Sequence, residues 1–284
     1  MKLRLALHVS LALIVLAACS SGGASPSAAP SAASPSGVAT TAPSAPAGST
    51  EITIFGAASL KGALDTAKTA YETANPGVKL TISTDSSAAL ETQIEQGAPA
   101  DVFLSADTTN PKKLVDKGLA AGDPVTFAQN KLTVVVPTAN PAGIKTPADL
   151  AKTGVKVVAA GDEVPITKYA NMLVANLAKE PGYSTDFAAA YATNIVSKED
   201  NVKAVVAKVE LGEGDAGIVY VTDAKASTKV GTVEVPDSAN VIATYDGVVV
   251  KAAKDAAAAK AFLDWFAGPD GQAILSSFGF LPPS

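Results

Sequence analysis

The sequence is poor in the side chains that most often carry catalysis or bind transition metals. It contains a single histidine, His8, and a single cysteine, Cys19. Both lie near the N-terminus, so the chain beyond Cys19 has neither an imidazole nor a thiol. These absences exclude Ser–His and Cys–His nucleophilic catalysis from that part of the chain, and they exclude zinc sites built from histidine and cysteine.

Motifs of nucleotide-binding proteins and serine enzymes are missing as well. The sequence has no Walker A motif, no GxGxxG, no G-x-S-x-G and no S-x-x-K. One enzymatic alternative remains, an extracytoplasmic hydrolase in which Ser59 or Ser87 acts with a lysine such as Lys61. We therefore expect a binding protein that is not an enzyme and that holds no cofactor.

The first residues have the pattern of a secretion signal. Lys2 and Arg4 precede an apolar run, Leu5 to Ala17, that is too short and too early for an ordinary membrane span. The run ends in LAAC, which resembles the lipobox of bacterial lipoproteins, cleaved just before a lipid-modified cysteine. We predict a signal peptide at residues 1–18 and lipid attachment at Cys19. The two acyl chains of a diacylglyceryl group would anchor the protein stably to the outer face of the cell membrane.

The next segment, residues 19–49, has the composition of a flexible tether. Apart from Cys19 and Val38 it consists of Ser, Ala, Pro, Gly and Thr, so it has almost nothing to bury. Without residues 1–18 the chain has 20 basic against 27 acidic residues, a net charge of −7. An acidic chain argues against nucleic acid, and it requires that a bound anion be held by local dipoles. A surface lipoprotein that only scaffolds or adheres would also fit the tether.

From Thr50 onward, short apolar strands alternate with helices. This alternation predicts an α/β fold with a sheet rich in parallel strands, which places ligands at the carboxyl ends of strands, where helices begin. Phe262, Trp265 and Phe266 recur at helical spacing and indicate packing helices at the C-terminus. The expected strands are 51–55, 79–83, 101–104, 131–136, 155–159, 216–220 and 241–250, and the expected helices are 60–74, 88–96, 111–117, 165–178, 185–191 and 202–211.

Two short stretches place serines where a strand gives way to a helix. In GAASL, residues 56–60, Ser59 stands at a helix start, and in the segment beginning at Asp85, Ser86 and Ser87 precede the next apolar helix face. Either serine alone is an ordinary N-cap. Together, two helix N-termini with free N–H groups and hydroxyls can converge on one small anion.

With the run QIEQGAPADVFLSAD, residues 93–107, these stretches resemble the molybdate-binding proteins of bacterial molybdate ABC importers. The resemblance continues in GDEVPITKYA, residues 161–170, and in residues 197–224. It implies a two-lobed periplasmic-binding type II fold, in which each lobe is a mixed sheet flanked by helices and two crossover strands join the lobes. We expect residues 50–131 plus 246–284 in the first lobe and 132–245 in the second, with the strand at 131–136 running through both.

The resemblance also implies a set of anion ligands. Ser86 stands beside the matching serine and remains an alternative to it, and Thr167, which replaces a usual glycine, is a further candidate. The N–H of the matching valine is free if Asn201 caps its helix, but it is bonded internally if Ser197 caps the helix with Asp200 as partner. The implied ligands are Ser59, Ser87, the N–H of Ile166, the N–H of Val202, and the hydroxyl of Tyr220.

A shell built only of hydrogen-bond donors suits a tetrahedral dianion that is fully deprotonated at neutral pH. Phosphate carries a proton that such a shell leaves unpaired, and sulfate is smaller than molybdate or tungstate. The expected ligand is therefore molybdate or tungstate, bound as an oxyanion with no direct protein ligands to the metal. Another oxyanion, such as sulfate, is the alternative. The implied partner is an ABC permease in the membrane, and a cleft that must open and close favours a monomer.

Overall fold

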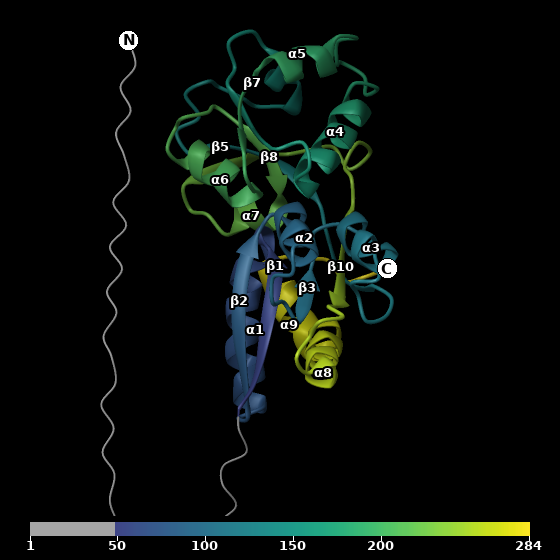
Figure 1. The fold of residues 1–284 in the computed structure, drawn as a ribbon. Helices are drawn as coiled ribbons and strands as arrows, with labels where there is room; N and C mark the ends of the chain where they lie inside the picture. The colour runs from purple at the N-terminus through teal and green to yellow at the C-terminus, as the bar shows by residue number, and fades with distance from the viewer. Residues whose placement is uncertain (1–48) are drawn as a thin grey trace, which may run out of the picture. The chain divides into compact units, whose positions relative to one another are not determined.

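The computed structural model describes residues 49–284. The predicted signal peptide, the lipid site at Cys19 and nearly all of the predicted tether lie outside the described residues. Within the described part, no helix combines the length and the apolar character that a membrane span requires. Ten strands and nine α-helices alternate along this part of the chain (Figure 1).

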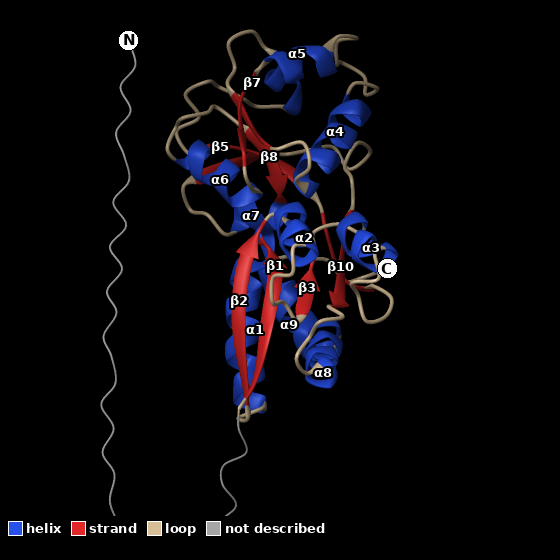
Figure 2. Ribbon diagram, in the orientation of Figure 1, coloured by secondary structure: helices blue, strands red, loops and turns tan. Residues whose placement is uncertain are grey.

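A five-stranded mixed sheet forms what we call the first lobe, together with the helices packed on it (Figure 2). The strands β1, β2 and β3 are parallel, whereas β10 runs antiparallel to both β3 and β4. In the order β2-β1-β3-β10-β4, the strands span Val78–Asp85, Thr50–Ala57, Val102–Leu104, Ala243–Val249 and Val125–Asn130.

The helices of the first lobe bury one face each against this sheet or against one another. In α1 the buried residues, Ala63, Leu64, Ala67 and Tyr71, recur at helical spacing. Of the C-terminal aromatic residues predicted to pack in the core, Phe262 and Phe266 are fully buried, whereas Trp265 is only partly buried. The helices are α1 Lys61–Ala74, α2 Ser87–Glu95, α3 Thr109–Asp116, α8 Ala256–Ala267 and α9 Pro269–Phe278.

Two smaller sheets with their helices form what we call the second lobe. The sheet β8-β5-β9 is antiparallel and the pair β6-β7 is parallel. The expectation of a parallel-rich sheet therefore holds only in part. The strands are β5 Leu132–Pro137, β6 Val157–Ala160, β7 Ile195–Glu199, β8 Gly217–Tyr220 and β9 Val230–Val233, and the helices are α4 Pro165–Leu177, α5 Phe187–Thr193, α6 Val202–Glu210 and α7 Val221–Lys225.

The chain passes between the sheets at two places. The first is at Lys131, between β4, which ends at Asn130, and β5, which begins at Leu132. The strand expected at 131–136 is β5, which lies in the second-lobe sheet alone and does not run through both lobes. The apolar run of β5 has another cause, since Leu132 to Val136 are buried in the middle strand of its own sheet. The second passage precedes Ala243, three residues before the expected boundary, because Ala243 already pairs with β4.

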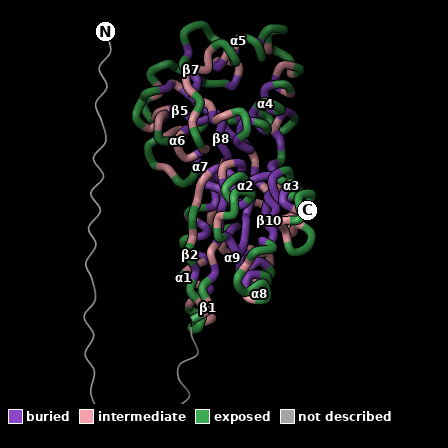
Figure 3. Tube along the Cα trace, in the orientation of Figure 1, coloured by how far each residue is buried: buried purple, intermediate pink, exposed green. Residues whose placement is uncertain are grey.

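Burial follows the strands and the inner sides of the helices (Figure 3). One cluster of buried apolar side chains extends through both lobes, and a smaller one lies between α2, α3 and the first sheet. Several strands of both lobes end at the boundary between these lobes, and several helices begin there (Figure 1).

Candidate functional site

A small cavity lies where the two lobes meet, with about 210 Å³ of empty space. Its walls come from the ends of β1 and β8, from the loop after β3, and from the starts of four helices. All five predicted ligands line it, as does Ser86, whereas Thr167 does not. The lining residues are Ala57, Ala58, Ser59, Ser86, Ser87, Ala106, Val164, Pro165, Ile166, Asn201, Val202 and Tyr220.

Ser59 reaches the cavity from a single 3₁₀ turn, Ala58–Leu60, between β1 and α1. The turn packs closely, since a Cβ atom at Gly56 would collide with the side chain of Leu64. The Ser59 Oγ lies 3.0 Å from the hydroxyl of Tyr245. Within the described part of the chain, the N–H of Ser59 has no hydrogen-bond partner. Ser59 therefore brings an unpaired N–H and a hydroxyl to the cavity.

The two adjacent serines at the start of α2 differ in what they have left to donate. Ser86 is the N-cap: its Oγ accepts from the N–H of Ala89 at 3.2 Å, and its own N–H donates to Asp85 Oδ1 at 2.7 Å. The Oγ of Ser87 accepts from the N–H of Ala106 at 2.9 Å. Among residues 49–284 nothing accepts the N–H of Ser87. Ser87 thus retains two hydrogens for an anion, whereas Ser86 retains one.

The first turn of α4 faces the same cavity from the second lobe. Pro165 occupies the first helical position, where a missing N–H costs nothing, and Ile166 follows it. No acceptor for the N–H of Ile166 is found in the described residues. Thr167 is not a ligand candidate in this structure, because its Oγ1 donates to the carbonyl of Ala160 at 2.9 Å. Its backbone is also ordinary, since among the described non-glycine residues only Asn140 has a positive φ.

The N-cap of α6 is Asn201, which settles the capping question. Its Oδ1 accepts from the N–H of Ala204 at 3.2 Å, and Ser197 lies in β7 instead. The N–H of Val202, the first helical residue, is left without a partner in the part of the chain described. The Nδ2 of Asn201 donates to Asp85 Oδ1 at 2.9 Å, so this cap also ties the second lobe to the first.

Tyr220 ends β8 with its ring packed between two other tyrosines. Its ring centroid lies 6.4 Å from that of Tyr169 and 5.7 Å from that of Tyr245. The hydroxyl is buried and, within residues 49–284, has no hydrogen-bond partner. Burial raises the pKa of Tyr220 well above its ordinary value, so the group remains a phenol that can donate.

Within residues 49–284, no lysine or arginine lines the cavity. The only arginine of the sequence is Arg4. An ion pair between α6 and α7 joins Lys203 Nζ to the buried Asp223 Oδ1 at 3.0 Å. Burial raises the pKa of Asp223, and the lysine opposes that rise. The favourable potential for an anion must therefore come from the N-termini of α2, α4 and α6.

The arrangement does not provide the parts of a serine–lysine hydrolase. Lys61, the lysine nearest to Ser59 in sequence, pairs with Asp65 at the surface, with 2.9 Å between Nζ and Oδ2. The cavity lining includes no lysine, histidine or carboxylate that could act as a base toward either Ser59 or Ser87. The site can bind an acceptor-rich ligand, but it holds no group able to deprotonate a nucleophile.

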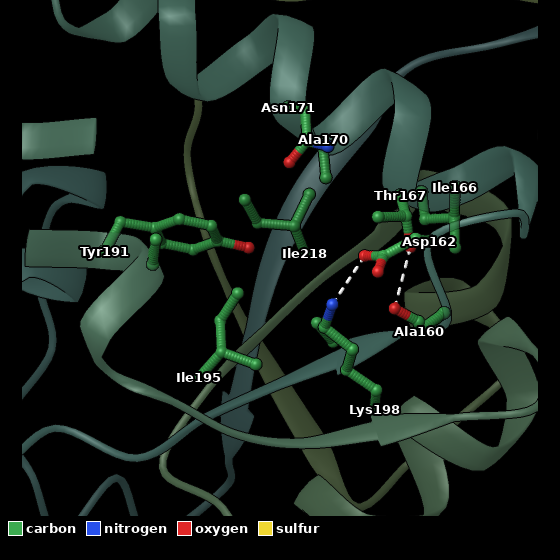
Figure 4. A pocket seen from close by; sticks show the side chains of 12 residues that line it. Ala160, Asp162, Ile166, Thr167, Ala170, Asn171, Tyr191, Ile195, Lys198 and Ile218 are labelled. Carbon is green, nitrogen blue, oxygen red and sulfur yellow. Dashed lines mark hydrogen bonds and ion pairs between the residues drawn. The ribbon is translucent and has the colours of Figure 1, made fainter. Parts of the chain in front are cut away.

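A larger cavity, with about 610 Å³ of empty space, lies inside the second lobe on the other side of the first turn of α4 (Figure 4). It shares Ile166 and Thr167 with that turn, and its walls are mostly aliphatic. Its two charged side chains, Asp162 and Lys198, neutralise each other as an ion pair at 2.5 Å. This cavity therefore presents no unpaired charged side chain among its described lining residues.

Three residues behind the site were missed from the sequence. Asp85 bridges the two lobes, Tyr245 contacts Ser59, and Asn130 Nδ2 lies 3.5 Å from the Tyr245 hydroxyl. The Tyr245 contacts join residues 186 and 115 positions apart, so no local pattern reports them. The only available signal was polarity within otherwise apolar strands, at Asn130 and Tyr245.

Residues 52–281 match the family model of bacterial extracellular solute-binding proteins. The chain belongs to this family. The molybdate-binding protein ModA of Mycobacterium tuberculosis is 36% identical over 245 residues, which cover 84% of this chain and 89% of that protein. The ModA of Escherichia coli is 33% identical and covers 81% of this chain and 88% of its own.

Solved structures share the fold of this solute-binding protein. The periplasmic molybdate-binding protein of Azotobacter vinelandii aligns with a TM-score of 0.67 and 25% identity over 82% of this chain and 100% of its own. The sulfate-binding protein SubI of Mycobacterium tuberculosis aligns with a TM-score of 0.73 but only 22% identity, over 82% of this chain and 87% of its own, and it therefore supports the fold alone. The two-lobed periplasmic-binding type II fold is confirmed.

Proposed function

We propose that this solute-binding protein captures molybdate, and also tungstate, in the cavity between its lobes and delivers the anion to an ABC permease. The observation that carries the proposal is the donor-only character of the cavity. Among the described residues, four backbone N–H groups and a phenol without partners face one small space, and no cationic side chain lines it. Relatives that share a third of this sequence are named for binding molybdate.

A fully deprotonated tetrahedral dianion offers only acceptors, so every free donor of the cavity finds a partner. Hydrogen bonds to charged groups contribute about 1.5–3 kcal/mol each, and helix N-termini add about 0.3–1 kcal/mol apiece. Several such contacts together give useful affinity without a lysine or arginine. In this proposal the donors are Ser59 and Ser87 from the first lobe, and Ile166, Val202 and Tyr220 from the second.

The same shell distinguishes between competing anions. Phosphate carries a proton at neutral pH, and that proton meets no acceptor in a cavity lined by donors. Sulfate is smaller than molybdate, so some of the donors would stay out of reach. Sulfate remains the main competitor for the site.

The proposal places the protein outside the cytoplasm, as a monomer anchored by a lipid on Cys19 through the tether at residues 19–49. Its role is transport rather than catalysis, and it needs no resident cofactor. The family membership and the absence of a base beside either serine support this assignment. Closure of the two lobes around the anion would present a distinct surface to the permease.

Thermal unfolding tests the ligand class directly. The chain without residues 1–18, with Cys19→Ser and freed of bound anion, is heated with molybdate, tungstate, sulfate or phosphate. A ligand at a thousand times its Kd adds about 4 kcal/mol, which raises the midpoint visibly. We expect molybdate and tungstate to stabilise the fold and phosphate to have no effect. Stabilisation by sulfate alone would identify sulfate as the ligand. No shift of the unfolding midpoint with any of the four anions would contradict the proposed oxyanion binding.

Ser59→Ala tests the site within the same assay. Loss of one hydrogen bond to a charged group should weaken molybdate binding by about tenfold to a hundredfold. The matched control is Ser276→Ala, an exposed serine in α9 remote from the cavity. Parent-like binding by Ser59→Ala would show that the anion sits elsewhere.

A further inference from the structure

Both serines proposed as ligands receive a hydrogen bond from behind the cavity. The Oγ of Ser87 accepts from the N–H of Ala106, which can only donate. The Ser87 hydroxyl must therefore direct its own hydrogen elsewhere, and the cavity is the space it faces. At Ser59 the group behind is the hydroxyl of Tyr245, 3.0 Å away, and either oxygen of that pair can in principle donate.

The surroundings of Tyr245 decide the direction of that bond. Tyr245 is fully buried, and in the described structure its hydroxyl contacts only Ser59 and the Nδ2 of Asn130. An amide nitrogen donates and cannot accept. If Ser59 donated to Tyr245, the tyrosine hydrogen would have no acceptor in a buried site, at a substantial cost. If Tyr245 donates, both of its contacts are satisfied and the Ser59 hydrogen is left for the cavity.

Tyr245 itself is not part of the cavity lining. Its ring packs edge-on against Phe127, Tyr220 and Phe280, with centroids 5.4 to 6.1 Å apart. Burial raises the pKa of Tyr245 well above its ordinary value, so the hydroxyl keeps its hydrogen at neutral pH. The aromatic packing fixes the ring, and the ring fixes the direction in which the hydroxyl points.

We propose that Tyr245 is a positioning residue of the anion site, which donates to Ser59 and so commits the Ser59 hydroxyl to donate into the cavity. The inference rests on the proposed function, because it needs an anion that accepts from Ser59. A hydroxyl that is free to rotate can accept a hydrogen bond from a protonated anion as well as donate one to a fully deprotonated anion. Tyr245 removes that freedom, as the Ala106 N–H does at Ser87. The result is selection against phosphate and other protonated oxyanions.

The test is a double-mutant cycle with Ser59→Ala and Tyr245→Phe, read by titration with molybdate. Because Tyr245→Phe removes one hydrogen bond that acts through Ser59, we expect it to weaken molybdate binding by about threefold to tenfold. In the Ser59→Ala background it should have no further effect, because the residue through which it acts is gone. An additive cycle, or unchanged affinity in Tyr245→Phe, would overturn the inference.

A second readout separates positioning from a general loss of packing. Competition with inorganic phosphate at neutral pH should show a narrower gap between the phosphate and molybdate affinities in Tyr245→Phe than in the parent. Equal weakening of both anions would overturn the proposed selection. Tyr71→Phe is the control, since Tyr71 is a buried tyrosine that packs on Phe262 and Trp265 and does not line the cavity.

These outcomes also separate this inference from the proposed function. If the parent binds molybdate and the cycle is additive, the function stands and only the role of Tyr245 fails. If the parent binds sulfate instead, the same cycle is run with sulfate, which also carries no proton at neutral pH. If the parent binds none of the four anions, both fail.

Discussion

The two lobes bring different mixtures of donors to the same cavity. The first lobe presents a hydroxyl and an unpaired N–H from each of Ser59 and Ser87, and both hydroxyls are hydrogen-bonded to a buried group behind the cavity. The second lobe presents mainly backbone N–H groups, at Ile166 and Val202, where the start of a helix leaves them unpaired. The residue type itself reveals a hydroxyl donor, whereas a free backbone N–H depends only on where a helix begins.

Some of these hydroxyls also form a hydrogen bond within the fold, whereas others are available only to the ligand. The Ser87 hydroxyl satisfies the buried N–H of Ala106 whether or not an anion is bound. The Tyr220 hydroxyl satisfies nothing within the described residues and is fully buried. The described part of the protein therefore gives the Tyr220 hydroxyl no partner of its own, and a ligand that accepts from it relieves that cost.

The largest effect is expected when a backbone donor of the second lobe is removed while its helix is kept. Val202 is the first residue of α6, a position that tolerates proline, and Asn201 before it is extended (φ −157°, ψ 171°), as a residue preceding proline prefers. Val202→Pro deletes the N–H and places a ring carbon in its place. We expect molybdate binding to fall by about a hundredfold, from a lost charged hydrogen bond and a narrowed cavity.

Val202→Ala is the matched control for that experiment. It trims the same buried side chain but keeps the N–H. Isothermal titration should find its affinity within a few-fold of the parent, together with a lower unfolding midpoint. Equal losses in Val202→Pro and Val202→Ala would mean that the side chain, and not the backbone, makes the contact.

Tyr220→Phe should separate binding from stability. Removal of its hydroxyl costs one hydrogen bond to the anion, so we expect binding to weaken by about tenfold or more. In the absence of anion, the midpoint of thermal unfolding should stay level or rise, because a buried unpaired group disappears. Ser87→Ala is the contrast: it should lower both affinity and midpoint, since it leaves the N–H of Ala106 without an acceptor. A lower midpoint for ligand-free Tyr220→Phe would contradict this division.

A smaller effect is expected at the bond that joins the lobes beside the cavity. Asp85 Oδ1 accepts from the N–H of Ser86 in the first lobe and from Asn201 Nδ2 in the second. Asp85→Ala should weaken molybdate binding by about twofold to tenfold, the range of one net hydrogen bond, mainly through faster release. Stopped-flow displacement measures that rate. Asp65→Ala, which breaks an exposed pair with Lys61, should leave it unchanged.

Much of the candidate site could be predicted because local sequence signals mark the N-termini of its helices. Pro165 and Val202 begin α4 and α6 as expected, since a proline at the first helical position and an asparagine cap are strong local signals. Ser59 and Ser87 also stand at predicted helix starts, whereas Tyr220 was assigned from the family resemblance. The contact between Tyr245 and Ser59 was not predicted, because it depends on packing between segments far apart in sequence.

The strands were predicted less well than the helices, for reasons that differ between them. The missed strands β4, β7 and β9 each lie at an edge of their sheet, where only part of the strand is buried. Edge strands need no continuous apolar pattern, so their sequences resemble loops. The strand at 131–136 was found but assigned to both lobes, because a run buried on both faces does not reveal which sheet it belongs to.

The smallest effect on binding is expected far from the cavity, at Asp149 in the short 3₁₀ helix Pro147–Ala151. Burial opposes the charge of this carboxylate, but the Lys152 ammonium and the N–H groups of Lys145 and Thr146 prevail and lower its pKa to about 2. A carboxylate with a lowered folded-state pKa stabilises the protein above its unfolded value of about 4, and this contribution disappears as the pH falls through about 2. Asp149→Asn should therefore lower the unfolding free energy by about 1 kcal/mol at pH 7, with no change in molybdate affinity. The difference from the parent should shrink below pH 4 and vanish near pH 2; a constant difference across that range would mean that the charge of Asp149 contributes nothing.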